Sequence, residues 1–524
     1  MSLLERADQT PDKPAFIDVK SGSVMTFCAL DDASIRLSRV LRRKLDPGDR
    51  VALLLENGPT YHVVSWAARR SQLRFVPINW HLNLEETLYI ADNCDARALV
   101  ASPHLAKLAL ELAARLPGLE ILLSDGEAFG PFAALTETLA AEPNEPLTPE
   151  MEGNFMFYSS GTTGQPKGIL RPLSGEPFGA LLDIEILMSG AFGFDADTRF
   201  YSPAPLYHAA PLGWTMGAVN LGGVAVVPPR FDAEAALKHI EQYRITHAQF
   251  VPTHFVRLLQ LPAAVRERYD LSSLKMVVHS AAPCPIEVKE QMLAWWGPVI
   301  FEYYGSSEGG GFTMVRPEEW MEHKGTVGRT TGGKIHVVDD EGRELPPGEV
   351  GHLMFEGAAR FDYHKEPGKT AEYFDGKGWS RPGDMGWIDE AGYLFLADRA
   401  SHMIISGGVN IYPQEAESVL ALHPAVGDVA VIGVPDLEMG EAVKAVIELA
   451  PGVEPSDTLA AELIGFCRAK LAGFKCPKTI DFIDTLPRLP TGKLLKRELR
   501  KRYYGEGPNQ ILGVKAQSDA GAAR

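Results

Sequence analysis

The chain has 524 residues, too many for one hydrophobic core, so we expect about two to four compact units. With 45% hydrophobic and 23% charged residues, the composition is that of an ordinary globular protein and indicates neither disorder nor a fibrous repeat. The formal charge of −17 disfavours a nucleic-acid partner, although a local loop can still bind a small anion such as a nucleotide.

The cysteines and the hydropathy pattern point to one kind of compartment. The five cysteines are scattered, without metal-like spacing, which favours a reduced environment. No stretch approaches the roughly 18 apolar residues that span a bilayer, and the first ten residues lack an apolar targeting core. We therefore predict a cytoplasmic protein without a membrane span, and a homodimer stays open.

Apolar runs and mixed segments alternate along most of the chain. The first series predicts strand, helix, strand, helix and strand at 51–55, 61–70, 75–78, 84–93 and 98–101. A second series predicts a strand, a helix and two strands at 222–227, 233–243, 248–251 and 276–279. Such alternation indicates parallel sheets with covering helices, so residues 1–400 are predicted to be a large α/β domain.

The pattern of predicted helices and strands changes after Arg399. Pro413 can open a helix, 429–434 and 442–449 are predicted strands, and Ser456 can cap a second helix. These elements predict a smaller α+β domain over 401–504. Residues 505–524, rich in Gly, Ala and polar residues, are predicted to be a flexible tail.

The strongest local signal begins where the apolar run 155–158 ends. A strand that opens into glycine and hydroxyl residues offers backbone N–H groups, hydroxyl donors and one ammonium to a polyphosphate. It is not a Walker A loop, because Gly168 stands where that motif needs Ser or Thr, and a flexible surface loop is the alternative. The predicted phosphate-binding residues are Ser159, Ser160, Gly161, Thr162, Thr163, Gly164 and Lys167.

This loop resembles the phosphate loop of the adenylate-forming superfamily, which includes acyl-CoA synthetases, adenylation domains of peptide synthetases and firefly luciferase. Six further motifs resemble those of the family in the same order, and the resemblance covers about residues 9–502. They are 205–208 (PLYH), 280–283 (SAAP), 302–308 (EYYGSSE), 381–384 (RPGD), 403–413 and 489–493 (LPTGK).

The resemblance implies a role for each motif. Glu308 would be the Mg²⁺ ligand, Asp384 would accept from the ribose hydroxyls, and Lys493 would reach the α-phosphate during acid activation. Tyr304 would cover the purine and Glu302 would accept from its amino group. The other implied ATP or AMP contacts are Ser280, Ala281, Ala282, Tyr303, Gly305, Ser307 and Arg399.

The acid and the acceptor have candidate sites as well. By resemblance, His208 borders the carboxylate, although a lone histidine in an apolar stretch is more often a packed core residue. Missing side chains at the glycine run would leave room for a bulky acid, unless the glycines are there for a tight turn. The predicted acid pocket is His208, Trp214, Val251, Thr253, Gly309, Gly310 and Gly311.

The C-terminal domain carries the remaining predictions. By resemblance, Gly407 and Gly408 line the passage for coenzyme A, and Ser401 is the hinge. Basic residues from Lys496 to Arg502 either meet the phosphates of CoA or form a solvated helix face. Pro382 replaces the Thr that usually precedes Gly-Asp in the family, which removes a hydroxyl and an N–H there.

Together these features predict a carboxylic acid:CoA ligase that uses ATP, Mg²⁺ and coenzyme A. Family similarity implies an acyl-AMP intermediate and then an acyl-CoA thioester, with an apolar fatty, cyclic or aryl-alkyl acid as substrate. The alternatives are a protein that loads a carrier protein, a luciferase-type oxygenase, and an inactive nucleotide-binding regulator on the same fold.

Overall fold

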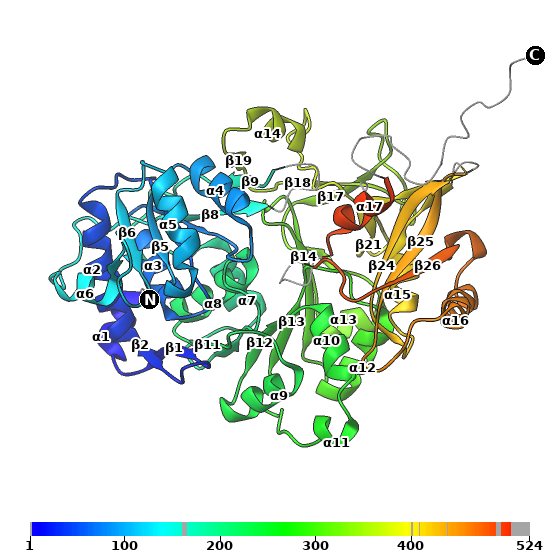
Figure 1. Ribbon diagram of the computed structural model, residues 1–524, viewed down its shortest axis with the longest axis horizontal. Helices are drawn as coiled ribbons and strands as arrows, with labels where there is room; N and C mark the ends of the chain where they lie inside the picture. Colours follow the sequence, from blue (N-terminus) through cyan, green and yellow to red (C-terminus); the bar gives the residue numbers. More distant parts are fainter. Residues whose placement is uncertain are drawn as a thin grey trace, which may run out of the picture.

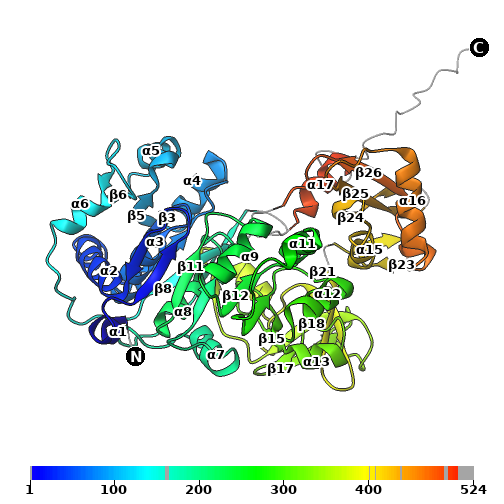
Figure 2. The same ribbon diagram turned by 90° about the horizontal axis from the view of Figure 1, so that it is seen from below.

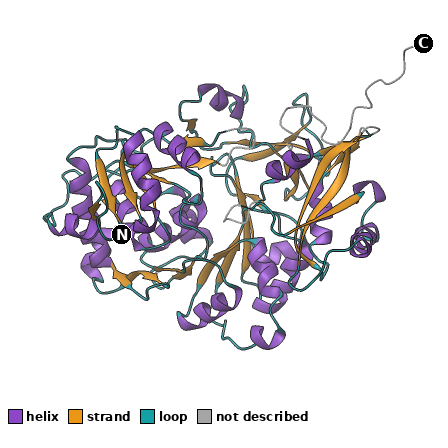
Figure 3. Ribbon diagram, viewed as in Figure 1, coloured by secondary structure: helices purple, strands orange, loops and turns teal. Residues whose placement is uncertain are grey.

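The computed structural model describes residues 3–159, 165–399, 402–407, 409–436, 439–488 and 494–504. A large N-terminal domain holds three sheets, and a smaller C-terminal domain holds a fourth (Figures 1 and 2). Helices cover the faces of the large sheets (Figure 3). The predicted α/β class with a smaller second domain is therefore confirmed.

The first large sheet has eight strands in the order β19-β9-β8-β4-β3-β5-β6-β7. Strands β8 to β7 run parallel, and β9 and β19 extend the edge in antiparallel fashion. The strands are β3 (Arg50–Leu54), β4 (Arg74–Pro77), β5 (Ala96–Ala101), β6 (Ile121–Ser124), β7 (Ala133–Ala134), β8 (Asn154–Ser159), β9 (Lys167–Leu170) and β19 (Asp362–Tyr363). The helices in this part of the chain are α2 (Phe27–Arg42), α3 (Pro59–Arg70), α4 (Leu84–Asn93), η1 (Pro103–Leu105), α5 (Ala106–Arg115) and α6 (Leu135–Ala140).

The second large sheet has nine strands in the order β16-β15-β14-β13-β12-β10-β11-β1-β2. Its central strands from β14 to β1 are parallel. The strands are β1 (Pro14–Asp18), β2 (Val24–Thr26), β10 (Arg199–Tyr201), β11 (Val224–Val227), β12 (His247–Phe250), β13 (Met276–His279), β14 (Ile300–Gly305), β15 (Phe312–Val315) and β16 (Arg329–Thr330). The helices are α1 (Leu3–Gln9), α7 (Asp183–Ala191), α8 (Ala209–Asn220), α9 (Ala233–Gln242), α10 (Pro252–Leu259), α11 (Ala263–Arg266), α12 (Ile286–Trp296) and α13 (Pro317–Glu322).

Two smaller sheets complete the chain. The antiparallel sheet β17-β18-β20-β21 belongs to the N-terminal domain, and its strands are β17 (Lys334–Val338), β18 (Gly351–Glu356), β20 (Asp384–Ile388) and β21 (Leu394–Arg399). Helix α14 (Pro367–Tyr373) packs against β19 of the eight-stranded sheet. The C-terminal sheet has the order β23-β22-β25-β24, and β26 pairs with β25. Its elements are β22 (Ile404–Ser406), β23 (Val409–Ile411), α15 (Pro413–Leu420), β24 (Val426–Asp436), β25 (Gly440–Leu449), α16 (Asp457–Arg468), η3 (Gly473–Lys475), β26 (Thr479–Ile483) and α17 (Lys496–Tyr504).

The predicted elements match the structure closely. All five elements of the first series and all four of the second are present, with ends shifted by about two residues at most. Pro413 opens α15, and the Ser456 hydroxyl accepts from the Leu459 N–H at 3.1 Å to cap α16. Strand β24 is longer than predicted because the chain stays extended from Val426 to Asp436.

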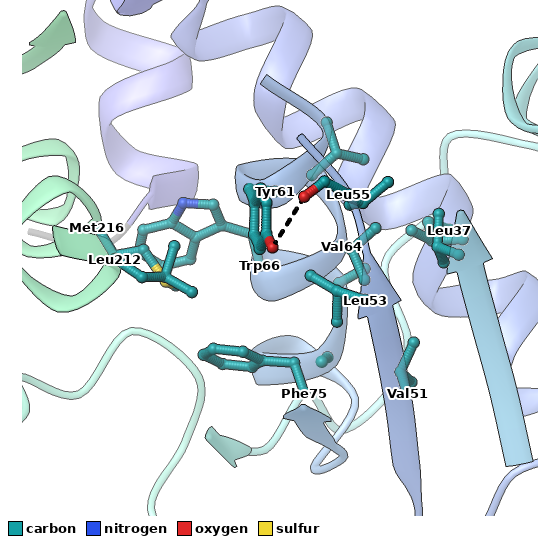
Figure 4. Close-up of a cluster of buried hydrophobic side chains, with 14 of the residues drawn as sticks. Leu37, Val51, Leu53, Leu55, Tyr61, Val64, Trp66, Phe75, Leu212 and Met216 are labelled. Atoms are coloured by element: carbon teal, nitrogen blue, oxygen red, sulfur yellow. Dashed lines mark hydrogen bonds between the residues drawn. The ribbon is translucent and has the colours of Figure 1, made fainter. Parts of the chain in front are cut away.

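Helix α3 lies between the two large sheets and is buried on all sides. Every residue from Thr60 to Arg70 is buried, and one apolar cluster joins α3 to strands of both sheets and to α8. Figure 4 shows the residues that pack there, from the first sheet, α3 and α8: Val51, Leu53, Leu55, Phe75, Tyr61, Val64, Trp66, Leu212 and Met216. The core of the N-terminal domain is therefore continuous across the two sheets.

Among the residues that the structure describes, no helix is both long and apolar enough to cross a bilayer. The domain boundary near residue 400 and the tail 505–524 fall on or beside residues outside the described ranges, and they stay predictions.

Three buried histidines should make the free energy of unfolding depend on pH. Burial lowers the pKa of His62 and His254 to about 3 and that of His247 to about 4. In the unfolded chain they titrate near 6.5, so between about pH 6.5 and 4 the unfolded state binds more protons than the folded state. The free energy of unfolding should therefore fall as pH decreases through this window, by up to about 1.4 kcal/mol per histidine and pH unit. Urea unfolding at pH 7 and pH 5 measures this, and equal stabilities would contradict it.

Candidate active site

The ends of parallel strands bring many of the predicted site residues to one edge of the nine-stranded sheet. Strands β12, β13 and β14 are parallel neighbours, so the residues after their last positions lie at the same edge. Val251 follows β12, Ser280 to Ala282 follow β13, and Ser306 to Glu308 follow β14. Ala281 has a positive φ of 75°, which is rare for a residue with a side chain and indicates a backbone held by its surroundings.

A hydrogen bond joins two predicted nucleotide residues that are 80 positions apart. The Tyr304 hydroxyl donates to the Asp384 carboxylate at 2.6 Å, and the Tyr304 ring stacks on Phe355 with centroids 6.0 Å apart. Asp384 is 8% exposed and begins β20, so the small antiparallel sheet lies against the strand ends of the large one. Because a carboxylate has two acceptor oxygens, this arrangement also suits a ligand with hydroxyl donors.

Glu308 and Lys167 both contact the side chain of Tyr363, Glu308 at its hydroxyl and Lys167 at its ring. The Tyr363 hydroxyl donates to Glu308 Oε1 at 3.1 Å, and Lys167 Nζ lies 4.8 Å from the centroid of the Tyr363 ring. Arg171 holds the same segment by donating to the Ser307 carbonyl at 3.2 Å. The lysine after the phosphate loop and the carboxylate after β14 are therefore close together, although they come from different sheets.

Glu302 has a partner inside the protein. Its carboxylate accepts from the Lys289 ammonium at 2.6 Å, and both side chains are buried. His279 Nε2 lies 3.4 Å from the same carboxylate. Burial raises the pKa of Glu302 against the opposing effect of Lys289, and burial together with Lys289 lowers the pKa of His279 well below its usual value. The predicted contact of Glu302 with a purine stays a prediction.

The run of three glycines does not leave empty space. A Cβ atom at Gly309 would meet the Arg171 guanidinium, one at Gly310 the Tyr373 hydroxyl, and one at Gly311 the Phe355 ring. Gly309 and Gly311 also have positive φ angles, of 73° and 143°. The expectation that their missing side chains make room for a bulky acid is therefore wrong, because protein side chains fill that room. Whether their backbone borders the acid stays a prediction.

The other predicted pocket residues have different surroundings. Trp214 is 2% exposed, packs among Phe192, Phe194 and Phe200, and donates to the Tyr303 hydroxyl at 3.4 Å. Val251 is buried. Thr253 is half-buried, as is His208, whose ring lies 4.6 Å from that of Tyr207.

A cavity of about 30 Å³ lies elsewhere, on a different part of α8. It is lined by Leu212, Gly213, Met216 and residues of β8 and α7, and by none of the predicted wall residues.

Several predicted residues lie outside the described part of the chain. They are Ser160, Gly161, Thr162, Thr163, Gly164, the side chain of Arg399, Ser401, Gly408 and Lys493. Gly407 is described: it has a φ of 58°, and its N–H donates to the Met439 carbonyl at 2.8 Å. The positive φ favours glycine in this turn, and a Cβ atom there would also displace the end of the Met439 side chain.

Two family models together match most of the chain. The model described as AMP-binding enzyme matches residues 3–362, and that described as AMP-binding enzyme C-terminal domain matches residues 415–493. The chain belongs to the AMP-binding enzyme family. The resemblance to the adenylate-forming superfamily is thereby confirmed.

Relatives of this AMP-binding enzyme are similar along their full length. A fatty acid–[acyl-carrier-protein] ligase, ScoC, from Streptomyces coeruleorubidus is 33% identical, over 96% of each chain. A feruloyl-CoA synthase from an Amycolatopsis species is 32% identical, over 92% of this chain and 94% of the relative. The solved structure of o-succinylbenzoate CoA synthetase (MenE) from Bacillus subtilis, in complex with its acyl-adenylate intermediate, is 27% identical with a TM-score of 0.79, over 95% and 97% of the two chains.

These relatives define the class of the AMP-binding enzyme. Several are CoA ligases at about 30% identity over most of the chain, so it is an enzyme of the AMP-forming acid–thiol ligase class. CoA ligases of this family use ATP and CoA.

Sequence reasoning missed Tyr363 and Lys289. The signal at Tyr363 is the pattern Phe361-Asp362-Tyr363, since alternation places both aromatic rings on one face of a strand. The signal at Lys289 is its helical spacing with Met292 and Trp296, which places a charge on the apolar face of α12.

We expect Lys289→Met to destabilise the AMP-binding enzyme by about 3–5 kcal/mol, because it leaves the Glu302 carboxylate buried without its partner. Adding Glu302→Gln should recover part of the loss, since the unpaired charge is then gone. Urea unfolding of the single and double variants measures both effects. A loss below about 1 kcal/mol for the single variant, as at an exposed ion pair, would contradict this reading.

Proposed function

We propose that this enzyme is an ATP-dependent carboxylic acid:CoA ligase that forms an acyl-AMP intermediate and then an acyl-CoA thioester, releasing AMP and pyrophosphate. The observation that carries the proposal is the pairing of two contacts at one sheet edge. Tyr304 and Asp384 form a hydrogen-bonded pair suited to a nucleoside, and Lys167 and Glu308 meet on Tyr363 where phosphates would follow. Similarity to a synthetase solved with its acyl-adenylate supports the order of the two steps.

The first half-reaction joins the acid to AMP. A carboxylate oxygen attacks the α-phosphorus of ATP, and the bond from that phosphorus to the bridging oxygen breaks, so pyrophosphate leaves. Asp384 binds the ribose hydroxyls, Tyr304 covers the purine, and Lys167 pairs with the phosphates. Lys493 stabilises the negative charge that builds on the oxygens of the α-phosphate.

The half-buried Glu308 carboxylate fits a Mg²⁺ ion, because hard oxygen donors suit this cation and its other ligands come from phosphates and water. When bound, the ion neutralises charge on the phosphates. Among the described residues there is no group of three or more His, Cys, Asp or Glu that could hold a metal by itself. We therefore propose that Glu308 and the phosphates of ATP would hold the ion together.

The second half-reaction transfers the acyl group. The thiolate of CoA attacks the acyl carbon, and the bond to the AMP oxygen breaks, so AMP leaves with its electron pair. We assign the passage for the thiol to Gly407 and Gly408. Gly407 lies in a turn with a positive φ of 58°, a backbone conformation that favours glycine.

A second candidate acceptor is the thiol of a carrier protein. The relative from Streptomyces coeruleorubidus, named as an acyl-carrier-protein ligase, favours it. The chemistry of the two thiols is the same, so the acceptor must be decided by experiment.

For the acid, we propose a fatty, cyclic or aryl-alkyl molecule. The apolar Val251, just after β12, and Trp214, on α8, support this class, as do relatives named for fatty acids and for feruloyl-CoA. The enzyme should therefore release more pyrophosphate per unit time with octanoate, phenylpropanoate or cyclohexane carboxylate than with acetate. Pyrophosphate release across such a panel, with CoA, with a phosphopantetheinylated carrier protein and with neither, tests both acid and acceptor. If acetate or a dicarboxylate has the highest kcat/KM, the assignment of an apolar acid is wrong.

Mutations at the C-terminal domain should separate the two half-reactions. Lys493→Ala should slow acyl-AMP formation by about 10²–10³-fold, the usual effect of losing a preorganised donor at a developing oxyanion, yet still convert supplied acyl-AMP to thioester. Gly408→Leu should do the opposite, because a bulky side chain there obstructs the thiol and not the nucleotide. Single-turnover assays of each step, with thermal unfolding as the folding control, measure this. Equal losses in both steps for both variants would refute the division.

A further inference from the structure

Tyr363 occupies an edge position that connects the two large sheets. It ends the short strand β19, which pairs with β9 in the register Tyr363↔Ile169 (Figure 1). Lys167 is the first residue of β9. Glu308, by contrast, follows β14 of the other sheet. The Tyr363 side chain thus joins Arg171 in linking the chain just after the phosphate loop to the segment that carries the candidate magnesium ligand.

The hydroxyl and ring of Tyr363 make different contacts. Its hydroxyl donates to Glu308 Oε1 at 3.1 Å, whereas its ring receives the Lys167 ammonium at 4.8 Å from the centroid. The ring, rather than a direct ion pair, therefore lies between the two opposite charges. A cation on an aromatic face is held less tightly than one in a buried ion pair, so Lys167 can transfer to a phosphate. A hydroxyl donor engages one carboxylate oxygen and leaves its partner oxygen to face a cation.

The position of Tyr363 is fixed by its packing. The residue is 7% exposed, and its ring contacts Phe361 and Tyr373 at centroid distances of 5.0 and 6.0 Å. Its backbone N–H donates to Thr370 Oγ1 at 2.8 Å. A side chain held from three sides gives Glu308 and Lys167 a rigid reference point.

The backbone near Glu308 has a separate support. Arg171 donates to the Ser307 carbonyl, and the Ser380 hydroxyl donates to the Gly310 carbonyl. Removing the Tyr363 hydroxyl should therefore release the Glu308 side chain while the loop backbone stays in place.

From these contacts we propose that Tyr363 is a positioning residue, which orients Glu308 through its hydroxyl and Lys167 through its ring for the Mg²⁺ and the phosphates of ATP. The inference rests on the proposed function. It adds one residue whose hydroxyl and ring have separate roles. Two substitutions, Tyr363→Phe and Tyr363→Leu, can separate these roles.

Tyr363→Phe removes the hydroxyl and keeps the ring. Losing a residue that orients a metal ligand usually weakens metal affinity 10–100-fold, so the Mg²⁺ concentration for half-maximal pyrophosphate release should rise at least about tenfold. Binding of ATP without Mg²⁺ should be unchanged, because the ring still holds Lys167. Tyr363→Leu removes both contacts, so metal-free ATP binding should weaken as well.

Tyr393→Phe is the matched control. The Tyr393 hydroxyl donates to Glu319 Oε1 at 3.3 Å, and this residue is 6% exposed, but its contacts lie outside the candidate active site. It therefore reports what losing a buried Tyr–Glu hydrogen bond does to folding alone. Its Mg²⁺ dependence and ATP binding should equal those of the parent.

The decisive readout is calorimetric binding of the α,β-methylene analogue of ATP, with and without Mg²⁺, to full-length variants. It needs no acid and no turnover, so it tests Tyr363 even if the parent activates no acid in the panel. The proposal predicts weaker binding for Tyr363→Phe only when Mg²⁺ is present, and no further weakening when Tyr363→Phe is added to Glu308→Gln.

Two results would overturn the proposal. One is Tyr363→Phe binding the analogue and Mg²⁺ as Tyr393→Phe does. The other is a weakening of binding that is equal with and without Mg²⁺ and follows a loss of thermal stability, since that pattern belongs to a purely structural residue.

Discussion

A guanidinium buried between two sheets is the interaction on which the N-terminal domain depends. Arg69 lies in the last turn of the buried helix α3, and its side chain is 1% exposed. It pairs with Glu152, just before β8, and with Glu185 of α7 at 3.0 Å. Such charges lose hydration on burial, so they persist only when every partner is in place. The Glu152 carboxylate also accepts from the Gly179 N–H at 2.9 Å, and Glu185 from Asn220 of α8 at 2.8 Å. One charge cluster therefore fixes the start of β8 and the segment beyond β9, on both sides of the phosphate loop.

The site follows from where this frame places strand ends. Parallel strands deliver loops to a common edge, and the small antiparallel sheet closes over that edge through the hydrogen bond from Tyr304 to Asp384. The three glycines after Glu308 belong to the same closure, because Tyr373 and Phe355 pack where their side chains would be. Close packing rather than an open pocket explains them. The proposed acid pocket then depends on other side chains, among them Trp214 of α8, whose surroundings are apolar.

The sequence predicted the elements and the order of the motifs, because both depend on local patterns. Alternating apolar runs located β3, α3, β4, α4 and β5, and the strand before the phosphate loop. Contacts between residues far apart in the sequence could not be predicted in this way. Helical spacing places Lys289 on the apolar face of α12, but the sequence does not show that its partner is Glu302, 13 positions away. Tyr363 carries no local mark of its hydrogen bond to Glu308, 55 positions earlier. The glycine run had two interpretations, and only the positions of Arg171, Tyr373 and Phe355 decided between them.

The junction between the domains is held partly by charge. Lys496, at the start of α17, is 6% exposed and pairs with Glu417 of α15 at 2.8 Å within the C-terminal domain. The same ammonium lies 3.8 Å from Asp398, on the last strand of the N-terminal domain, and His402 lies 3.2 Å from that carboxylate. The contact within the domain is thus shorter than the contact across the junction. If the C-terminal domain turns between the two proposed half-reactions, Lys496 keeps its Glu417 partner, so its charge is never left alone. In such a turn Lys496 would exchange the longer contact, to Asp398, for water while its shorter ion pair stays intact.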